Sequence, residues 1–347
     1  MSACPLPMKV HRNRLLPSLR RTSHSILLVT LLAAFAQAQV CLDASDMEAA
    51  TRTAVEAAAR RYYDMVTRGD SAGIQQNAIP GVGSNFAPVE AAIKAIQPDL
   101  SRAQAVLRPL WELQVTGTDT IERAEFLCGV FGAHGQTAGS AVFVIPNLPP
   151  GNYAIATFDA SATKGPFTVS FVLQQAGNDW KVGGFYAKAA QVAGHDGKWF
   201  ADRAREFKTK GQTRNAWLYF VQARDLSSPL PFMSTSVTDK LYDEMQTVQP
   251  SDLPMSGSSV DFPAGAKTYK LTSVFPAGLG EELDLVVRYQ AADVSNTAQV
   301  YQDNIALIKA LLAKYPEFRD GFSGVVARAV DTSGRDYGSL LQMKDVK

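Results

Sequence analysis

The chain has 347 residues, 34 basic and 33 acidic, a formal net charge of +1, and 46% hydrophobic residues. This composition is typical of a folded globular protein and excludes a disordered or collagen-like chain. The near-neutral charge argues against a nucleic-acid-binding protein, and no apolar run approaches the roughly 18 residues that predict a membrane span.

The first 38 residues have the pattern of a secretory signal peptide. They carry five basic residues and no acidic one, then an apolar run from Ile26 to Ala36, then the small residues Ala36 and Ala38 before a cleavage site. We predict residues 1–38 as the signal peptide and hence an exported protein, periplasmic or extracellular, with no membrane insertion after cleavage. Cleavage would lower the formal net charge from +1 to −4.

Two cysteines, Cys41 and Cys128, remain after cleavage. An even pair in an oxidising compartment predicts a disulfide, which would close a loop of about 88 residues and stabilise the fold by roughly 4 kcal/mol in the chain-entropy model. The alternative is that Cys128 is a small buried hydrophobic residue and Cys41 is a free thiol.

Residues 39–193 read as helices followed by a long antiparallel sheet. The motif Ser45-x-x-Glu48 and the later Gly69 predict the two ends of a long helix, and a shorter helix is expected from Pro88 to Ile96. Between residues 105 and 187 apolar and polar residues alternate, which predicts five or six strands. This order predicts an α+β fold class.

Several residues of this domain resemble the ketosteroid-isomerase and nuclear-transport-factor superfamily. They are Tyr62-Tyr63, Gly69-Asp70, Ile74 and, near the end of the domain, the run from Asn178 to Val182. The resemblance covers residues 43–190. It implies a cone-shaped domain in which a curved sheet wraps the helices and leaves a pocket open at one end.

Residues 194–249 form a helical segment. Phe200, Ala204 and Phe207 share one helix face, Gly211 breaks the pattern, and a second apolar face follows at Ala216, Phe220 and Ala223. We predict helices over Lys198–Lys210 and Thr213–Leu226. Residues 197–230 resemble a single tetratricopeptide repeat, although Arg203 stands where an apolar residue is usual.

One such repeat cannot bury both of its faces. Trp217 and Val221 belong to the second face, and we name them as the candidate interaction surface. Either the following helix, near Leu241 and Met245, covers this face or a protein partner docks there.

Residues 250–266 are rich in proline, serine and glycine and are predicted as a linker. Alternating strands and one amphipathic helix follow over 267–347, in the order ββαββ. We therefore expect a second small α+β domain, for which the sequence indicates no family.

Catalytic chemistry has weak support in the sequence. His134 and His195 belong to no closely spaced ligand set, so we predict no metal and no cofactor. Tyr153 and Asp159 lie six residues apart on one strand and are the catalytic candidates, as an oxyanion donor and a base. The alternative is that Asp159 begins an exposed turn.

Two functions stay open at this stage. The modular layout favours a secreted or periplasmic non-catalytic binding protein, with a protein partner at the helical segment or a small apolar ligand. The alternative is a small-molecule isomerase or dehydratase that uses the pocket of the cone-shaped domain. An ionisable residue at the bottom of an enclosed cavity would favour the enzyme.

Overall fold

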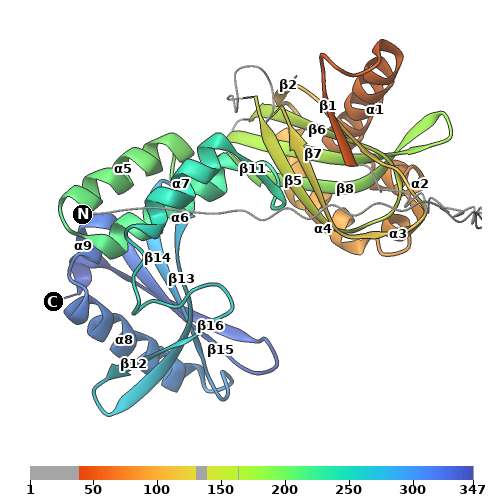
Figure 1. Cartoon of the computed structure of the whole chain (residues 1–347). Helices are drawn as coiled ribbons and strands as arrows, with labels where there is room; N and C mark the ends of the chain where they lie inside the picture. The colour runs from red at the N-terminus through yellow and green to blue at the C-terminus, as the bar shows by residue number, and fades with distance from the viewer. Residues whose placement is uncertain (1–38, 130–138, 163, 347) are drawn as a thin grey trace, which may run out of the picture. The chain divides into compact units, whose positions relative to one another are not determined.

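The computed structural model describes residues 39–129, 139–162 and 164–346. The predicted signal peptide and His134 lie outside these ranges. The described residues form an α+β fold, as the sequence predicts (Figure 1). Within them, no helix is long and apolar enough to cross a membrane.

The N-terminal helices differ from the prediction at two of their ends. They are α1 (Ala49–Arg68), α2 (Ser71–Gln76), α3 (Pro80–Gly83) and α4 (Ala87–Leu100). Helix α1 ends at Gly69 in the left-handed conformation, as expected. The predicted capping box is wrong, because the Ser45 hydroxyl bonds the Asp43 carboxylate and Glu48 makes no side-chain cap. Helix α4 also continues through Pro98 rather than ending before it.

The first sheet is antiparallel, and its strand order is β1-β3-β6-β7-β8, with β2 beside β6. The strands are β1 (Gln39–Asp43), β2 (Gln104–Leu107), β3 (Trp111–Val115), β6 (Gly151–Ala162), β7 (Gly165–Ala176) and β8 (Asp179–Ala189). Helices α1 and α4 pack on one face of this sheet. Aromatic rings fill the space between, with Tyr63 and Phe158 at 4.7 Å and Phe158 and Phe171 at 6.3 Å between ring centroids.

A second sheet packs on the other face of the first. Its strands are β4 (Ile121–Cys128), β5 (Ala141–Leu148) and β11 (Met233–Thr235), in the order β11-β5-β4. Trp111 and Phe143 meet between the sheets, 5.5 Å between ring centroids. The predicted disulfide is confirmed, since Cys41 on β1 and Cys128 on β4 are bonded with their Cα atoms 5.2 Å apart. It therefore links the two sheets covalently.

The helical segment contains the predicted pair of helices. The two-residue strands β9 (Gln191–Val192) and β10 (His195–Asp196) precede α5 (Gly197–Thr209) and α6 (Thr213–Ser227), and α7 (Ser236–Gln246) follows β11. Gly211 adopts φ +73° between α5 and α6, a value that glycine reaches without strain. The side chains expected to face one another across the pair are buried: Phe200, Ala204, Phe207, Ala216, Phe220 and Ala223.

The C-terminal sheet has five strands in the order β12-β13-β14-β15-β16. The elements are β12 (Val260–Ala264), β13 (Lys267–Leu279), β14 (Glu282–Gln290), α8 (Thr297–Lys314), α9 (Phe318–Gly321), β15 (Gly324–Val330), β16 (Asp336–Gln342) and the 3₁₀ turn η1 (Met343–Asp345). Strands β14 and β15 are parallel and α8 connects them, while the other neighbours are antiparallel.

Part of the predicted linker is folded structure. Strand β12 lies inside residues 250–266 and pairs with β13, and Leu253 and Phe262 are each only 1% exposed. With β12 and the short helix α9, the order of this region is βββααββ rather than ββαββ. Pro263 is tolerated because β12 is the end strand of the sheet, where one row of backbone groups needs no strand partner.

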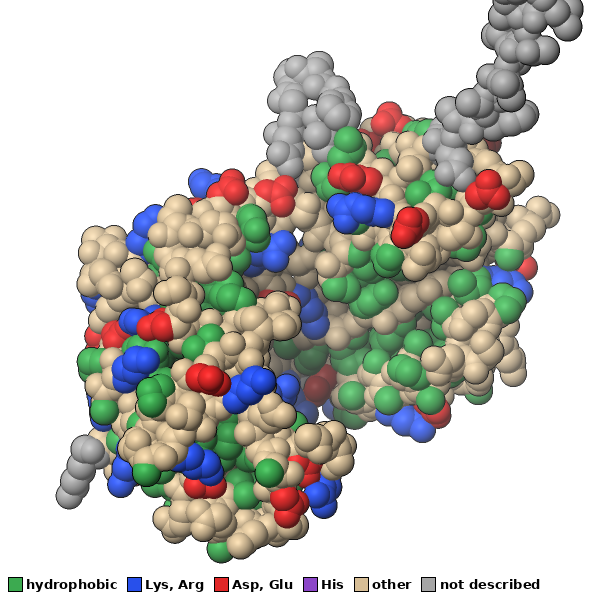
Figure 2. All heavy atoms as spheres, turned by 60° about the horizontal axis from the view of Figure 1, so that its bottom comes forward, with side chains coloured by type: hydrophobic (Ala, Val, Ile, Leu, Met, Phe, Trp, Pro, Cys, Tyr) green, Lys and Arg blue, Asp and Glu red, His purple; other side chains and the backbone are tan. Residues whose placement is uncertain are grey.

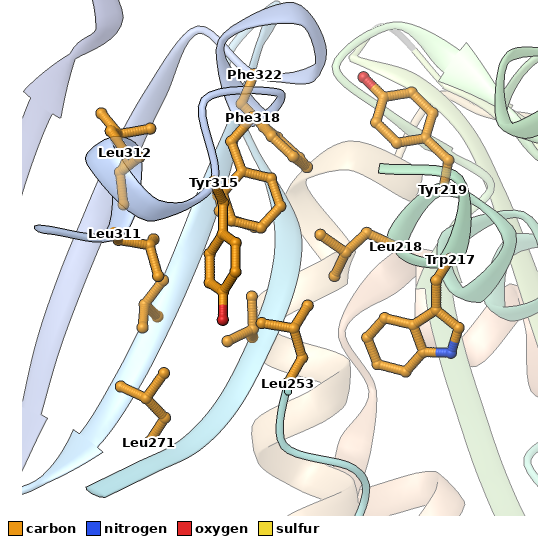
Figure 3. Close-up of a cluster of buried hydrophobic side chains, with 14 of the residues drawn as sticks. Trp217, Leu218, Tyr219, Leu253, Leu271, Leu311, Leu312, Tyr315, Phe318 and Phe322 are labelled. Atoms are coloured by element: carbon orange, nitrogen blue, oxygen red, sulfur yellow. The ribbon is translucent and has the colours of Figure 1, made fainter. Parts of the chain in front are cut away.

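The helical segment and the C-terminal sheet share one hydrophobic core. Figure 3 shows side chains of α6 and of the α8–α9 region in this core, with Leu253 from the α7–β12 connection between them. Polar contacts reinforce it, because the Arg214 guanidinium bonds both carboxylate oxygens of Asp252 and lies 2.8 Å from Glu317 Oε1. The helices are thus an integral layer of this body.

Candidate functional site

A cleft of about 640 Å³ opens beside β8, the last strand in the order of the first sheet. One wall is formed by β8 residues from Phe185 to Lys188. The opposite wall is formed by the last turns of α6, including Val221 and Arg224, and by the connection from α6 to β11. We call this the β8–α6 cleft.

A bulge in β8 shapes the first wall. The pairing of β7 with β8 shifts register between Val172 and Leu173, opposite two consecutive glycines. A Cβ atom on Gly184 would lie 3.1 Å from the Tyr186 ring, so the glycine makes room for that ring. The Tyr186 ring also packs edge-on against Phe232, 5.6 Å between centroids, and burial raises the pKa of the Tyr186 hydroxyl.

Two prolines and one serine set the opposite wall. Helix α6 ends at Ser227, and Pro229 and Pro231 cannot continue it. The Ser228 hydroxyl shares its one proton between the Leu230 carbonyl at 2.7 Å and the Met233 carbonyl at 3.0 Å. These bonds hold the connection against β11, so the cleft is built by ordered backbone.

Lys188 is the cation on the β8 wall. Its amine donates to the Asp225 backbone carbonyl in the last turn of α6, and Nζ lies 3.6 Å from the Asp225 carboxylate. The Lys188 side chain is 29% exposed and that of Asp225 67%. Desolvation lowers the pKa of Lys188, and Asp225 opposes that shift.

Arg224 is the cation on the α6 wall. Its guanidinium lies 5.4 Å from the centroid of the Tyr242 ring, a cation–π contact. Leu230 and Met233 add apolar surface to the same cleft. The arrangement therefore combines an apolar lining with two cationic groups and one carboxylate.

The predicted catalytic pair is not brought together. Tyr153 is 4% exposed, and its hydroxyl donates to the Pro149 carbonyl at 2.8 Å. Asp159 is exposed and forms an ion pair with Arg108 at 2.6 Å. Six residues along a strand span about 20 Å, too far for both groups to act on one reacting atom. The structure therefore places Tyr153 and Asp159 in separate environments.

The predicted interaction surface divides into two parts. Trp217 is only 6% exposed and shares the core with Leu241 and Met245, so the chain itself covers this side chain. Trp217 is thus not available to a partner. Val221 is half-buried and lines the β8–α6 cleft instead.

One buried acid was missed by the sequence analysis. Glu112 on β3 is 4% exposed, and its carboxylate accepts a hydrogen bond of 2.9 Å from the Gln114 amide. It pairs with Ala154, whose side chain belongs to the core beneath the helices. Its place between the inward-facing Trp111 and Leu113 could have indicated that Glu112 points to the opposite face.

Metal-binding and charge patterns single out no other site. Among the residues that the structure describes, no group of three or more histidine, cysteine, aspartate or glutamate side chains could hold a metal ion. Figure 2 shows acidic and basic side chains interspersed with apolar ones over the face in view.

Comparisons with protein-family models, curated proteins and solved structures found no match to this chain.

Proposed function

We propose that the protein is an exported, non-catalytic binding protein whose small-molecule ligand occupies the β8–α6 cleft. The observation that carries this proposal is the cleft itself. Its volume, about 640 Å³, lies within the range of small-molecule sites. Such sites combine an apolar lining with a few convergent polar groups, which is the composition of these walls.

The disulfide supports the export part of the proposal. Structural disulfides persist in oxidising compartments such as the periplasm and the extracellular space. The Cys41–Cys128 bond joins two sheets of the same fold. An N-terminal signal peptide over residues 1–38 agrees with this location.

We keep the two family resemblances within the proposal. Helices that precede a long antiparallel sheet support the cone-shaped superfamily for residues 39–193. Two helices joined at Gly211 support the tetratricopeptide-like segment over 197–230. The second sheet, which includes β11 from beyond this repeat, departs from a simple modular layout.

The enzyme alternative rests on Glu112, a buried carboxylate on the helix-covered face of the first sheet. An isomerase or dehydratase needs space for a substrate next to such a group. Tyr62, Tyr63 and Phe171 pack in the core on this face. We therefore rank binding in the β8–α6 cleft above catalysis in the cone.

A titration with Nile red, an uncharged apolar dye, tests the binding function on the purified exported chain. We expect saturable fluorescence enhancement for the wild type and about tenfold weaker binding for Val221→Trp, because the larger indole takes up space in the cleft and blocks part of the α6 wall. The control is Val106→Trp, which changes a side chain that is 70% exposed on β2. Equal affinity of the Val221→Trp variant and the wild type, or no saturable binding by the wild type, would contradict the proposal.

A further inference from the structure

The charges in the β8–α6 cleft are unequal. Lys188 and Arg224 contribute two positive charges and Asp225 one negative charge. A cleft lined by an excess of one sign of charge favours a ligand of the opposite sign. The cleft should therefore attract an anion more than a cation or an uncharged group.

Arg224 is arranged to accept a planar anion. Its guanidinium lies 5.4 Å from the centroid of the Tyr242 ring, and this cation–π contact takes up no N–H donor in a hydrogen bond. No ion pair of Arg224 occurs among residues 39–129, 139–162 and 164–346. The guanidinium fork matches the two oxygens of a carboxylate.

Lys188 is a second donor whose present acidic partner is loosely held. The separation of 3.6 Å between Nζ and the Asp225 carboxylate exceeds the 2.7–2.9 Å typical of a charge-assisted hydrogen bond. The Asp225 side chain is 67% exposed, so it can turn toward solvent. The Lys188 amine keeps its bond to the Asp225 backbone carbonyl and has further N–H groups for a ligand.

The apolar lining requires the ligand to have an apolar body as well. Phe185, Leu230 and Met233 line the same cleft together with the half-buried Val221. A small inorganic anion would leave this surface in contact with water, whereas an apolar body would cover it.

From these groups we infer that the β8–α6 cleft binds a small amphiphilic carboxylate. The carboxylate lies against Arg224 and Lys188, and the apolar body lies against Phe185, Leu230 and Met233. This inference rests on the proposed binding function and adds the chemical class of the ligand.

Isothermal titration calorimetry with three matched probes tests the ligand class. They are naphthalene-2-carboxylate, the uncharged 2-naphthalenemethanol and the cationic 2-naphthylmethylammonium. We expect the carboxylate to bind about tenfold more tightly than the alcohol, the effect of one hydrogen bond to a charged group, and the ammonium to bind most weakly.

Substitutions then assign the effect to the cleft. Arg224→Gln should weaken carboxylate binding about tenfold and leave alcohol binding unchanged. Arg102→Gln removes the same charge from an exposed position outside the cleft and should change neither. Lys188→Met provides a second variant on the opposite wall with the same expected pattern.

The outcomes separate this inference from the function on which it rests. Equal binding of carboxylate and alcohol, tighter binding of the ammonium, or equal losses in Arg224→Gln and Arg102→Gln would overturn the carboxylate assignment. If no naphthalene probe binds while Nile red binds in the cleft, the ligand class is wrong and the binding function stands. Failure of Nile red as well would refute both.

Discussion

Removing the Cys41–Cys128 bond should destabilise residues 39–193 selectively. The bond closes a loop whose ends are 87 residues apart in sequence. In the chain-entropy model such a loop contributes about 4.5 kcal/mol, by restricting the unfolded chain. The Cα atoms, 5.2 Å apart, lie within the range of ordinary disulfides.

The assay is urea unfolding with and without reductant, in which hydrogen exchange and mass spectrometry detect the unfolding of each segment. This method reports the two main bodies separately, which is needed because residues 197–346 have their own core. We expect reductant to lower the free energy of unfolding of residues 39–193 by about 4.5 kcal/mol. The change in the C-terminal body should be small by comparison.

The matched control is the double variant Cys41→Ala, Cys128→Ala. Its stability should be lower than that of the oxidised wild type and should not respond to reductant. A reductant effect below about 1 kcal/mol in the wild type, or an equal effect in the double variant, would refute the loop-closure argument.

Two further predictions concern the C-terminal body. Burial raises the pKa of Asp284, which is 2% exposed. A carboxyl group whose native pKa is raised loses stabilising free energy as pH rises, so Asp284→Asn should stabilise the protein at pH 7 and lose that advantage toward pH 4. Thermal unfolding across this pH range checks it, and a constant or opposite effect would contradict it. Trp217→Ala should lower the free energy of unfolding, measured with urea, by about 3–5 kcal/mol. Trp217→Phe should lower it much less, because the indole N–H has no acceptor among the described residues and its removal breaks no hydrogen bond. Equal losses in the two variants would contradict this reasoning.

Local patterns predicted the elements that depend on nearby residues. The helix pair around Gly211 follows from its 3.6-residue periodicity and from a glycine at a positive φ. The strands from Phe126 to Val182 follow from period-two alternation, and the disulfide from an even number of cysteines. Each of these signals is either a pattern within a short stretch of sequence or the number of cysteines.

The errors arose where long-range packing overrides local composition. Residues 250–266 have the composition of a linker, yet Leu253 and Phe262 enter a core whose other members lie far along the chain. Strand β11 pairs with β5 across about 90 residues of sequence, and no local pattern marks that partnership. The β8–α6 cleft is a long-range feature as well, because its walls come from β8 and from residues 221–233, which lie far apart in the sequence.

Hydrogen exchange with and without naphthalene-2-carboxylate tests the central claim most directly, because it locates the bound ligand on the chain. The account predicts slower exchange in β8 around residues 185–188 and in residues 221–231, with no change in the C-terminal sheet. Protection confined to any other part of the chain, with none in these two segments, would contradict it.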